Sequence, residues 1–181
     1  MTLVTGAEAL PYAFQIVGIV LITTATVMIV AGATLLGWIK DVKSAGIVQI
    51  ACGGMTLVMG LYLAWGIQVI MPAGLCIMFG IAQTLFGVHN YIGAKFDGLG
   101  WLSVVFAIGV GYYVYWFFSL GFPTWGALCI TWFLIFVFVA CLVIHAKPFW
   151  VKVNAIWLLL TGFITLLAPG LITLSQLYAI T

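Results

Sequence analysis

Charged residues are almost absent from this chain, and their spacing divides it into long apolar runs. From residue 44 to residue 94, and again from residue 98 to residue 146, there is no Asp, Glu, Lys or Arg. Hydrophobic residues make up 66% of the chain and charged residues 4%, too few to cover the surface of a water-soluble domain. The chain is therefore predicted to be an all-α integral membrane protein.

Six apolar segments are long enough to cross a bilayer, which takes a helix of about 20 residues. Pro72, Pro123 and Pro148 stand at the starts of three of them, where proline fits the first helical turn. Pro169 falls inside the last segment, where it should kink the helix or free a carbonyl group. We expect one transmembrane domain over residues 1–181, a bundle of six helices at about 11–37, 43–65, 72–92, 99–120, 123–145 and 149–177.

The lysines predict the direction in which the helices cross the membrane. All five lie around the first, third and fifth turns, whereas the second and fourth turns carry no charge. Lysine-bearing turns face the cytoplasm by the positive-inside rule, so both termini are expected outside, in a multi-pass protein of the inner, cytoplasmic cell membrane. The first apolar run has no basic segment before it, so we expect a retained helix rather than a cleaved signal peptide.

The predicted membrane interior contains no Asp, Glu, Lys or Arg, although ion-coupled transporters place such groups near the midplane. His89 and His145 fall near cytoplasmic helix ends, and two isolated histidines do not make a metal site. No nucleophile–base pair is available for catalysis. We therefore expect no catalytic residue, cofactor, metal ion or nucleic-acid partner. A pore for neutral solutes, a structural subunit and a sensor remain.

Aromatic and neutral polar side chains recur at helical spacing on three of the predicted helices. Gln83 follows Phe79 by four residues, so both lie on one face. Each such feature alone is explained by packing, by an interhelical hydrogen bond or by a threonine bonded to its own helix. Together they describe a narrow slot for a small, planar, neutral solute that forms hydrogen bonds. The other two stripes are Trp125, Cys129, Trp132 and Phe136, and Asn154, Thr161 and Thr165.

Several segments of the chain, in their order and with the six-helix topology, resemble the AmiS/UreI family of urea channels and short-chain amide transporters. The segment after the first turn is similar to the family's D-x-K-S followed by Gly-Gly. The resemblance covers nearly the whole chain. The segments are IVGIVLI (16–22), DVKSAGIVQIACGG (41–54), FGIAQTLFGVHNYIG (79–93), GWLSVVFAI (100–108), TWGALCITWFLIF (124–136) and LTGFITLLAPGL (160–171).

The resemblance implies a homohexamer of six-helix protomers, with a pore inside each protomer and lipid filling the centre of the ring. Transport would be passive and would serve a cytoplasmic amidase or urease. Matching the segments to the family, and adding Thr165 from the polar stripe, gives the expected pore-lining residues. They are Phe14, Leu21, Phe79, Gln83, Trp125, Cys129, Trp132, Phe136, Thr161 and Thr165.

The chain departs from the family's pattern at three points. Thr161 stands where urea channels carry a pore carboxylate, so the pore is expected to be neutral. Gln83 and Cys129 replace aromatic residues, so that point should be wider and more polar. The acid-gated member has long external loops rich in His and carboxylates, whereas Glu8 is the only titrating group expected on that side here. Acid gating is therefore not expected.

The expected function is a constitutively open, passive channel for short-chain aliphatic amides such as acetamide, and for urea. Two alternatives stay open. An ammonia or water pore of the same architecture would differ in the solutes that pass. A non-transporting membrane subunit or sensor would pass none and would co-purify with a partner. An enzyme is not expected.

Overall fold

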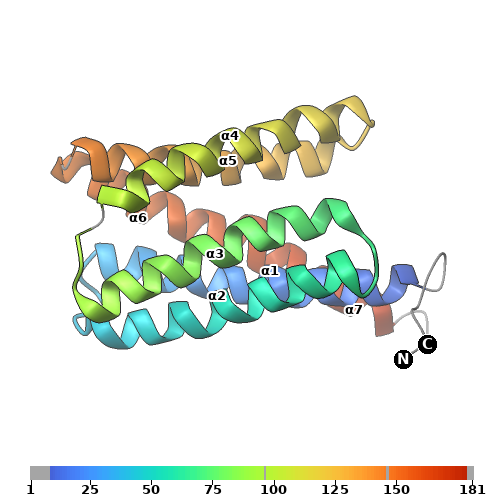
Figure 1. Cartoon of the computed structure of the whole chain (residues 1–181), viewed down its shortest axis with the longest axis horizontal. Helices are drawn as coiled ribbons and strands as arrows, with labels where there is room; N and C mark the ends of the chain where they lie inside the picture. Colours follow the sequence, from blue (N-terminus) through green and yellow to red (C-terminus); the bar gives the residue numbers. More distant parts are fainter. Residues whose placement is uncertain (1–8, 96, 146, 179–181) are drawn as a thin grey trace.

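Helices form most of the computed structural model, which describes residues 9–95, 97–145 and 147–178 (Figure 1). These ranges contain no strand and six segments that are long and apolar enough to cross a membrane. The prediction of an all-helical, multi-pass membrane fold is confirmed. In chain order the elements are α1 (Ala9–Leu35), α2 (Val42–Trp65), α3 (Ile70–Ile92), α4 (Asp97–Ser119), α5 (Pro123–His145), α6 (Pro148–Leu160), the π-helix η2 (Thr161–Leu167) and α7 (Ala168–Tyr178).

The helices pack as three antiparallel pairs. α2 lies along α3, α4 lies along α5, and α1 lies along the sixth span, which consists of α6, η2 and α7 (Figure 1). Within the described residues, α3 has no close backbone contact with α5 or with α6. The main hydrophobic core lies between these pairs and is formed by side chains of α1, α3, α4, α5 and the sixth span.

The turns gather at two opposite ends of the bundle. The start of α1, the end of α7, the α2–α3 turn and the α4–α5 turn lie together on the right of Figure 1. The lysines lie at or beside the three turns on the left. We call these the lysine-free end and the lysine end. At the lysine end, Asp41 caps α2, because its carboxylate accepts hydrogen bonds from the backbone N–H groups of Lys43 (3.1 Å) and Ser44 (3.2 Å).

Glycines let α2 and α3 approach closely. Gly46, Gly53 and Gly60 recur every seven residues on α2, and a side chain at any of them would collide with α3. A Cβ atom added at Gly53 would lie 2.6 Å from the backbone nitrogen of Thr84 and 2.8 Å from Cβ of Gln83. Small residues at such spacing are the usual means of close helix packing in membranes. The contact fixes the backbone of α3 at the level of Gln83.

The sixth span is not one continuous α-helix. Its central segment, Thr161–Leu167, is π-helical and ends two residues before Pro169. Proline lacks an N–H group and crowds the preceding turn, which a wider π-helical turn accommodates. The segment packs tightly on α1, since a Cβ atom added at Gly162 would lie 2.8 Å from the side chain of Ile29. The disturbance expected at Pro169 thus takes the form of a π-helix.

Helix ends differ from the expected ones by a few residues. α1 ends at Leu35 rather than near residue 37, because Gly37 adopts a left-handed conformation (φ 74°) and the Trp38 N–H donates to the Ala33 carbonyl oxygen at 2.9 Å. α3 and α4 each begin two residues earlier than expected, at Ile70 and at Asp97. Glu8 lies outside the described residues.

Candidate functional site

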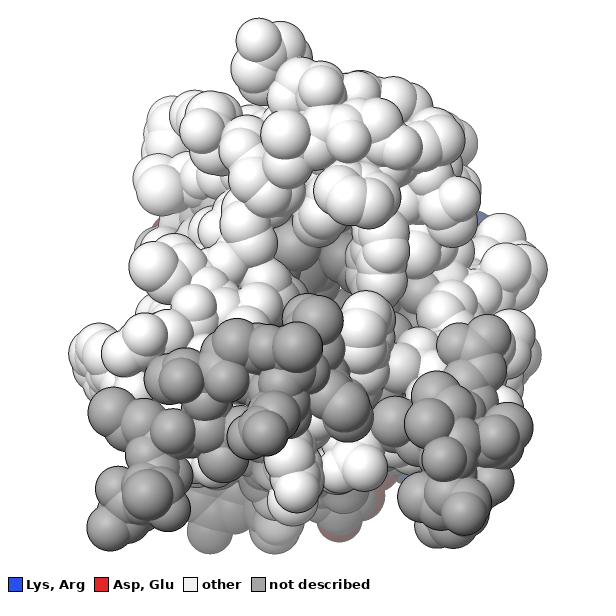
Figure 2. Space-filling model, turned by 90° about the vertical axis from the view of Figure 1, so that its right-hand side faces the viewer, with Lys and Arg blue, Asp and Glu red and all other residues white. Residues whose placement is uncertain are grey.

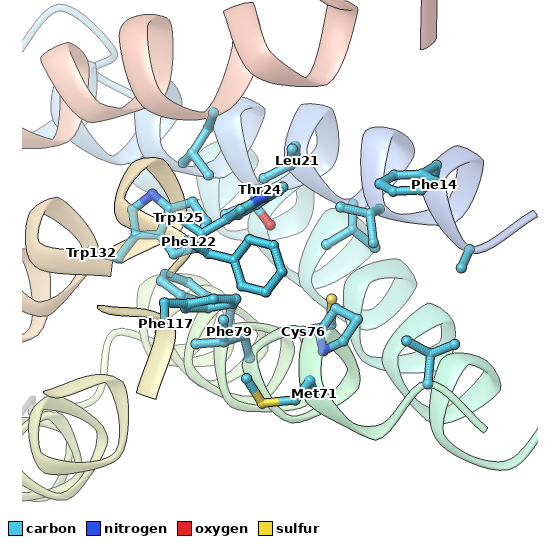
Figure 3. A pocket seen from close by; sticks show the side chains of 17 residues that line it. Phe14, Leu21, Thr24, Met71, Cys76, Phe79, Phe117, Phe122, Trp125 and Trp132 are labelled. Atoms are coloured by element: carbon cyan, nitrogen blue, oxygen red, sulfur yellow. The ribbon is translucent and has the colours of Figure 1, made fainter. Parts of the chain in front are cut away.

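A cavity of about 280 Å³ lies between α1, α3 and α5 toward the lysine-free end (Figure 3). Its walls are apolar except at Thr24, whose buried hydroxyl has no hydrogen-bond partner among the described residues. Thr24 and Leu21 reach the cavity from α1, opposite a group of rings that includes Phe79 (Figure 3). We call it the aromatic cavity, after the aromatic members of its lining, Phe14, Phe79, Phe117, Phe122, Trp125 and Trp132.

The described surface around the mouth of this cavity is uncharged. Figure 2 looks onto the lysine-free end and shows a recess in a face that is almost entirely white where it is not grey. Phe14, which is 51% exposed, and Phe122 stand near this end and line the aromatic cavity. A solute that approaches from this end therefore meets aromatic and aliphatic side chains before any charged group of the described chain.

A second cavity, of about 460 Å³, lies toward the lysine end. α2, α3 and α6 contribute four side-chain amides to its lining, and Asp97 is the one charged residue among the described residues that border it. Apolar side chains of α1, α5 and α6 form most of the remaining wall. We call it the amide cavity, after Gln49, Gln83, Asn90 and Asn154.

Three rings separate the two cavities. The Phe79 ring of α3 lies 5.8 Å from Trp132 and 5.2 Å from Phe136, both of α5, between ring centroids. The first pair is edge-to-face at 82° and the second is tilted at 47°, arrangements in which aromatic rings attract one another. All three side chains are at most 4% exposed. We call them the three-ring partition, through which α3 and α5 meet although their backbones do not.

Along α1, α3 and α5 the three-ring partition is less than one helical turn thick. Three residues rise by about 4.5 Å in an α-helix. Along these three helices, only the three rings and their immediate neighbours lie between the two linings. On each of these helices, the last residue that lines the aromatic cavity and the nearest residue that lines the amide cavity are three positions apart. The pairs are Thr24 and Val27 on α1, Phe79 and Ala82 on α3, and Trp132 and Ile135 on α5.

A threonine of the π-helix holds one ring of the partition. Trp132 Nε1–H donates a hydrogen bond to Thr165 Oγ1 at 3.2 Å. The same hydroxyl donates to the Thr161 carbonyl oxygen at 3.0 Å, so both of its bonding roles are satisfied. The orientation of the indole ring is thus coupled to the backbone of η2.

The amides of the amide cavity differ in their hydrogen bonds. Asn90 Nδ2 donates to Gln49 Oε1 at 2.7 Å and so links α3 to α2. Gln83 is 2% exposed and Asn154 1% exposed, and neither side-chain amide has a hydrogen-bond partner among the described residues. Buried polar groups are nearly always paired, so two unpaired amides in one cavity make it a candidate binding site.

The arrangement of two cavities and a thin partition occurs in a chain that matches a known family of transporters. The family described as AmiS/UreI family transporters matches residues 16–177. The chain belongs to the AmiS/UreI family. The resemblance inferred from the sequence segments is therefore confirmed. No curated protein matches the chain.

Two solved structures share the fold of this AmiS/UreI protein. The cryo-EM structure of the Helicobacter pylori urea channel in a closed state superposes with a TM-score of 0.78 at 18% sequence identity, over 88% of this chain and 97% of that chain. The crystal structure of the urea channel from the human gastric pathogen Helicobacter pylori gives a TM-score of 0.76 at 16% identity, over 88% and 98%. At these identities the likeness is one of fold. Both structures are channels and the family is one of transporters, not of enzymes.

The residues expected to line a pore in this AmiS/UreI protein fall into two groups. Seven of the ten border a cavity. Gln83 and Phe136 line the amide cavity, and the aromatic cavity is lined by Phe14, Leu21, Phe79, Trp125 and Trp132. The other three, Cys129, Thr161 and Thr165, line neither of these two cavities.

The three remaining residues lie close to the partition. Cys129 is fully buried in the hydrophobic core that surrounds the rings. Thr161 and Thr165 lie between Leu158, which lines the amide cavity, and Leu166, which lines the aromatic cavity. They therefore stand at the depth of the three-ring partition, where Thr165 accepts the hydrogen bond of Trp132.

Two polar residues outside the expected pore-lining set, Asn154 and Thr24, also reach the cavities. Asn154 was visible only as a member of a polar stripe, seven residues before Thr161. Thr24 stands between Thr23 and Thr26, whose hydroxyls donate to carbonyl oxygens of their own helix. Nothing in the spacing of these three threonines distinguishes the one that faces the cavity.

The side chains that could hold a metal ion or carry out covalent chemistry are scattered. Nowhere in the described ranges do three His, Cys, Asp or Glu side chains come together as possible ligands. The four cysteines are unpaired. A ring nitrogen of His89 is hydrogen-bonded to the Leu85 carbonyl oxygen at 2.8 Å, near the lysine end. What the site can offer a small molecule is shape, aromatic surface and neutral hydrogen-bonding groups.

Proposed function

We propose that this protein is a passive channel for small neutral amides, acetamide and urea among them. The observation that carries the proposal is the three-ring partition of Phe79, Trp132 and Phe136, less than one turn thick, between two cavities aligned along the bundle. Membership in a family of transporters and a fold shared with a urea channel support it.

The chemistry of the path favours neutral solutes. Removing a neutral amide from water costs about 2–7 kcal/mol without new hydrogen bonds, whereas an ion costs on the order of 20 kcal/mol in a low-dielectric medium. Among the described residues, the lining of the aromatic cavity offers no charge to offset the cost of an ion, and one hydroxyl, that of Thr24, to offset the cost of an amide. Flat solutes can stack on the rings of the partition while they pass. Such a path needs no coupling to an ion gradient.

The direction of the path follows from the lysines. We place the lysine end in the cytoplasm, because lysine-rich turns stay on that side of the inner membrane. A solute from outside then crosses the aromatic cavity first and the amide cavity second. Consumption by a cytoplasmic amidase or urease would keep its inward gradient. The same proposal includes a homohexamer with lipid in the centre of the ring, which native mass spectrometry of the purified protein would test.

Flux measurements on purified protein in liposomes test the function. We expect acetamide and urea to enter at least about tenfold faster than into empty liposomes, a difference of roughly 1.4 kcal/mol in barrier, while sodium and acetate stay excluded. Fast water or ammonia entry without amide entry would instead assign a pore for those molecules. Absence of any flux, with a second protein that co-purifies, would assign a non-transporting subunit.

A further inference from the structure

The amide cavity contains a binding arrangement that a simple opening does not require. We infer that Gln83 and Asn154 form a recognition site for a primary carboxamide, a group that carries a carbonyl acceptor and N–H donors on one carbon. This inference rests on the proposed function and deepens it, because it names where in the path the permeating molecule is recognised and by which residues.

Gln83 and Asn154 come from opposite sides of the amide cavity. Gln83 lies on α3 and Asn154 on α6, two helices without a close backbone contact in the described chain. Each side chain is at least 98% buried, and each presents an amide oxygen and an amide nitrogen without a partner. A molecule between the two helices can therefore accept and donate hydrogen bonds on both sides.

A purely structural role does not account for this pair. The same cavity contains Gln49 and Asn90, whose amides do bond to each other at 2.7 Å between α2 and α3. That pair shows what a structural amide contact looks like in this fold. Gln83 and Asn154 make no such bond, although leaving a buried polar group unpaired weakens a fold. Their amides remain available to a ligand.

The set of free groups selects the ligand by its hydrogen bonds. Two amide oxygens need donors and two amide nitrogens need acceptors, which a primary carboxamide or urea supplies together. A carboxylate supplies acceptors alone and brings a negative charge that no cationic side chain of the described lining balances. An ammonium group supplies donors alone. Asp97 is the one charged lining residue, and it adds to the exclusion of anions.

The rest of the lining fits the alkyl part of a short-chain amide. Val27 and Met28 of α1 and Leu158 of α6 present aliphatic surface to the same cavity that holds the two amides. The cavity measures about 460 Å³, so it has room for a short alkyl chain beside the polar end. The site therefore takes short aliphatic primary amides, with urea as the ligand that lacks the alkyl part.

Ligand-dependent thermal stability of the purified protein in detergent tests the site directly. The variants Gln83→Met and Asn154→Leu keep volume and remove the amides. Acetamide should raise the melting temperature of the wild type, because a ligand that binds only the folded state stabilises it by RT ln(1 + [L]/Kd). It should raise that of either variant much less. N,N-dimethylacetamide, which accepts hydrogen bonds but donates none, should stabilise none of the three.

The stability without ligand separates recognition from structure. Gln83→Met and Asn154→Leu should melt at or above the wild-type temperature, since they remove unpaired groups. Gln49→Met is the matched control and should melt lower, since it leaves Asn90 unpaired. If the first two variants melt lower as Gln49→Met does, or if acetamide stabilises them as well as it does the wild type, the proposed site is wrong.

Flux in liposomes distinguishes this inference from the proposed function. For wild-type protein the rate of acetamide entry should saturate with concentration, and each variant should raise the half-saturating concentration about two- to tenfold, the effect of one lost hydrogen bond. If wild-type flux equals that of both variants at all concentrations, the recognition site is contradicted, whereas the channel function is not. If acetamide binds but no flux is measured, the recognition site is supported and the channel function is contradicted.

Discussion

The indole N–H of Trp132 donates a hydrogen bond to the hydroxyl of Thr165, 3.2 Å away in the π-helical segment of the sixth span. One ring of the three-ring partition is therefore held by the irregular part of the bundle rather than by a regular helix. The hydroxyl also donates to the Thr161 carbonyl oxygen, so a change in η2 would move the acceptor that holds the ring. The position of the indole ring is thus linked to the geometry of η2.

The variant Thr165→Val tests this link. Valine keeps the shape of threonine but cannot accept the bond from Trp132, which is worth about 1 kcal/mol. We expect the ring to leave the partition more often and acetamide flux to rise about two- to tenfold, with a larger rise for the bulkier solute glycerol. Stopped-flow light scattering of proteoliposomes measures both rates.

Thr173 provides the control for that experiment. Its hydroxyl donates to the Pro169 carbonyl oxygen at 2.7 Å within α7, away from the partition. Thr173→Val should leave the ratio of glycerol to acetamide flux unchanged. An equal ratio for Thr165→Val and wild type would show that the hydrogen bond to Trp132 does not hold the path narrow.

The size limit of the path should depend on Phe79, because this ring contacts both other rings of the partition. Phe79→Ala removes the ring and should join the two cavities, so butyramide should gain flux relative to acetamide. Phe79→Leu should give a smaller gain. The alanine variant is expected to lose stability by about 3 kcal/mol, near the lower limit for buried phenylalanine, because cavities already adjoin the site. Relative fluxes that stay equal in the folded variants would contradict a limiting role for the ring.

Two neighbouring glycines of α2 should respond oppositely to alanine. At Gly53 the added Cβ would lie 2.6 Å from the backbone nitrogen of Thr84, so Gly53→Ala should cost about 1–3 kcal/mol as α2 and α3 are forced apart. At Gly54 the added Cβ would meet no heavy atom of another part of the described chain within 4 Å, so Gly54→Ala should gain about 0.5–1 kcal/mol from helix propensity. Melting temperatures in detergent measure both. Similar losses at the two positions would mean that α2 is in contact with another molecule on its outer side.

Amide flux should not depend on pH in the range where histidines titrate. The described lining of the aromatic cavity contains no His, Asp, Glu or Lys, and that of the amide cavity contains Asp97 alone. Acetamide should therefore enter proteoliposomes at equal rates at pH 5 and pH 7.5. In the variant Asp97→Asn the rates of acetamide entry at pH 5 and pH 7.5 should also be equal. A steep rise in wild-type flux at pH 5 would show instead that the protein is gated by acid.

The six spans could be predicted because the bilayer sets the length of each apolar run and confines charged residues to the turns between the runs. Apolar runs of the required length end at lysines or at prolines, and the structure places the lysine turns at one end of the bundle. Gln83 and Phe79 could be assigned to one face because α3 is a regular helix in which residues four apart align. Regular periodicity is what made these inferences possible.

The sixth span shows where such reasoning stops. The stripe of Asn154, Thr161 and Thr165 assumes a constant 3.6 residues per turn, but the helix changes to a π-helix at Thr161. Only Asn154, which precedes the change, lines the amide cavity. Proline signals that a helix is disturbed, but the form of the disturbance depends on the tight packing of Gly162 against α1, a contact between segments far apart in the sequence.

The apolar rings of the partition also limit the passage of protons through the protein. Protons cross proteins along unbroken files of hydrogen-bonded water, and Phe79 and Phe136 offer such a file nothing to bond to. Trp132 commits its N–H group to Thr165 and so offers nothing either. If amides cross the membrane between these rings, as we propose, they do so without a continuous file of water, so amide transport does not dissipate the membrane potential.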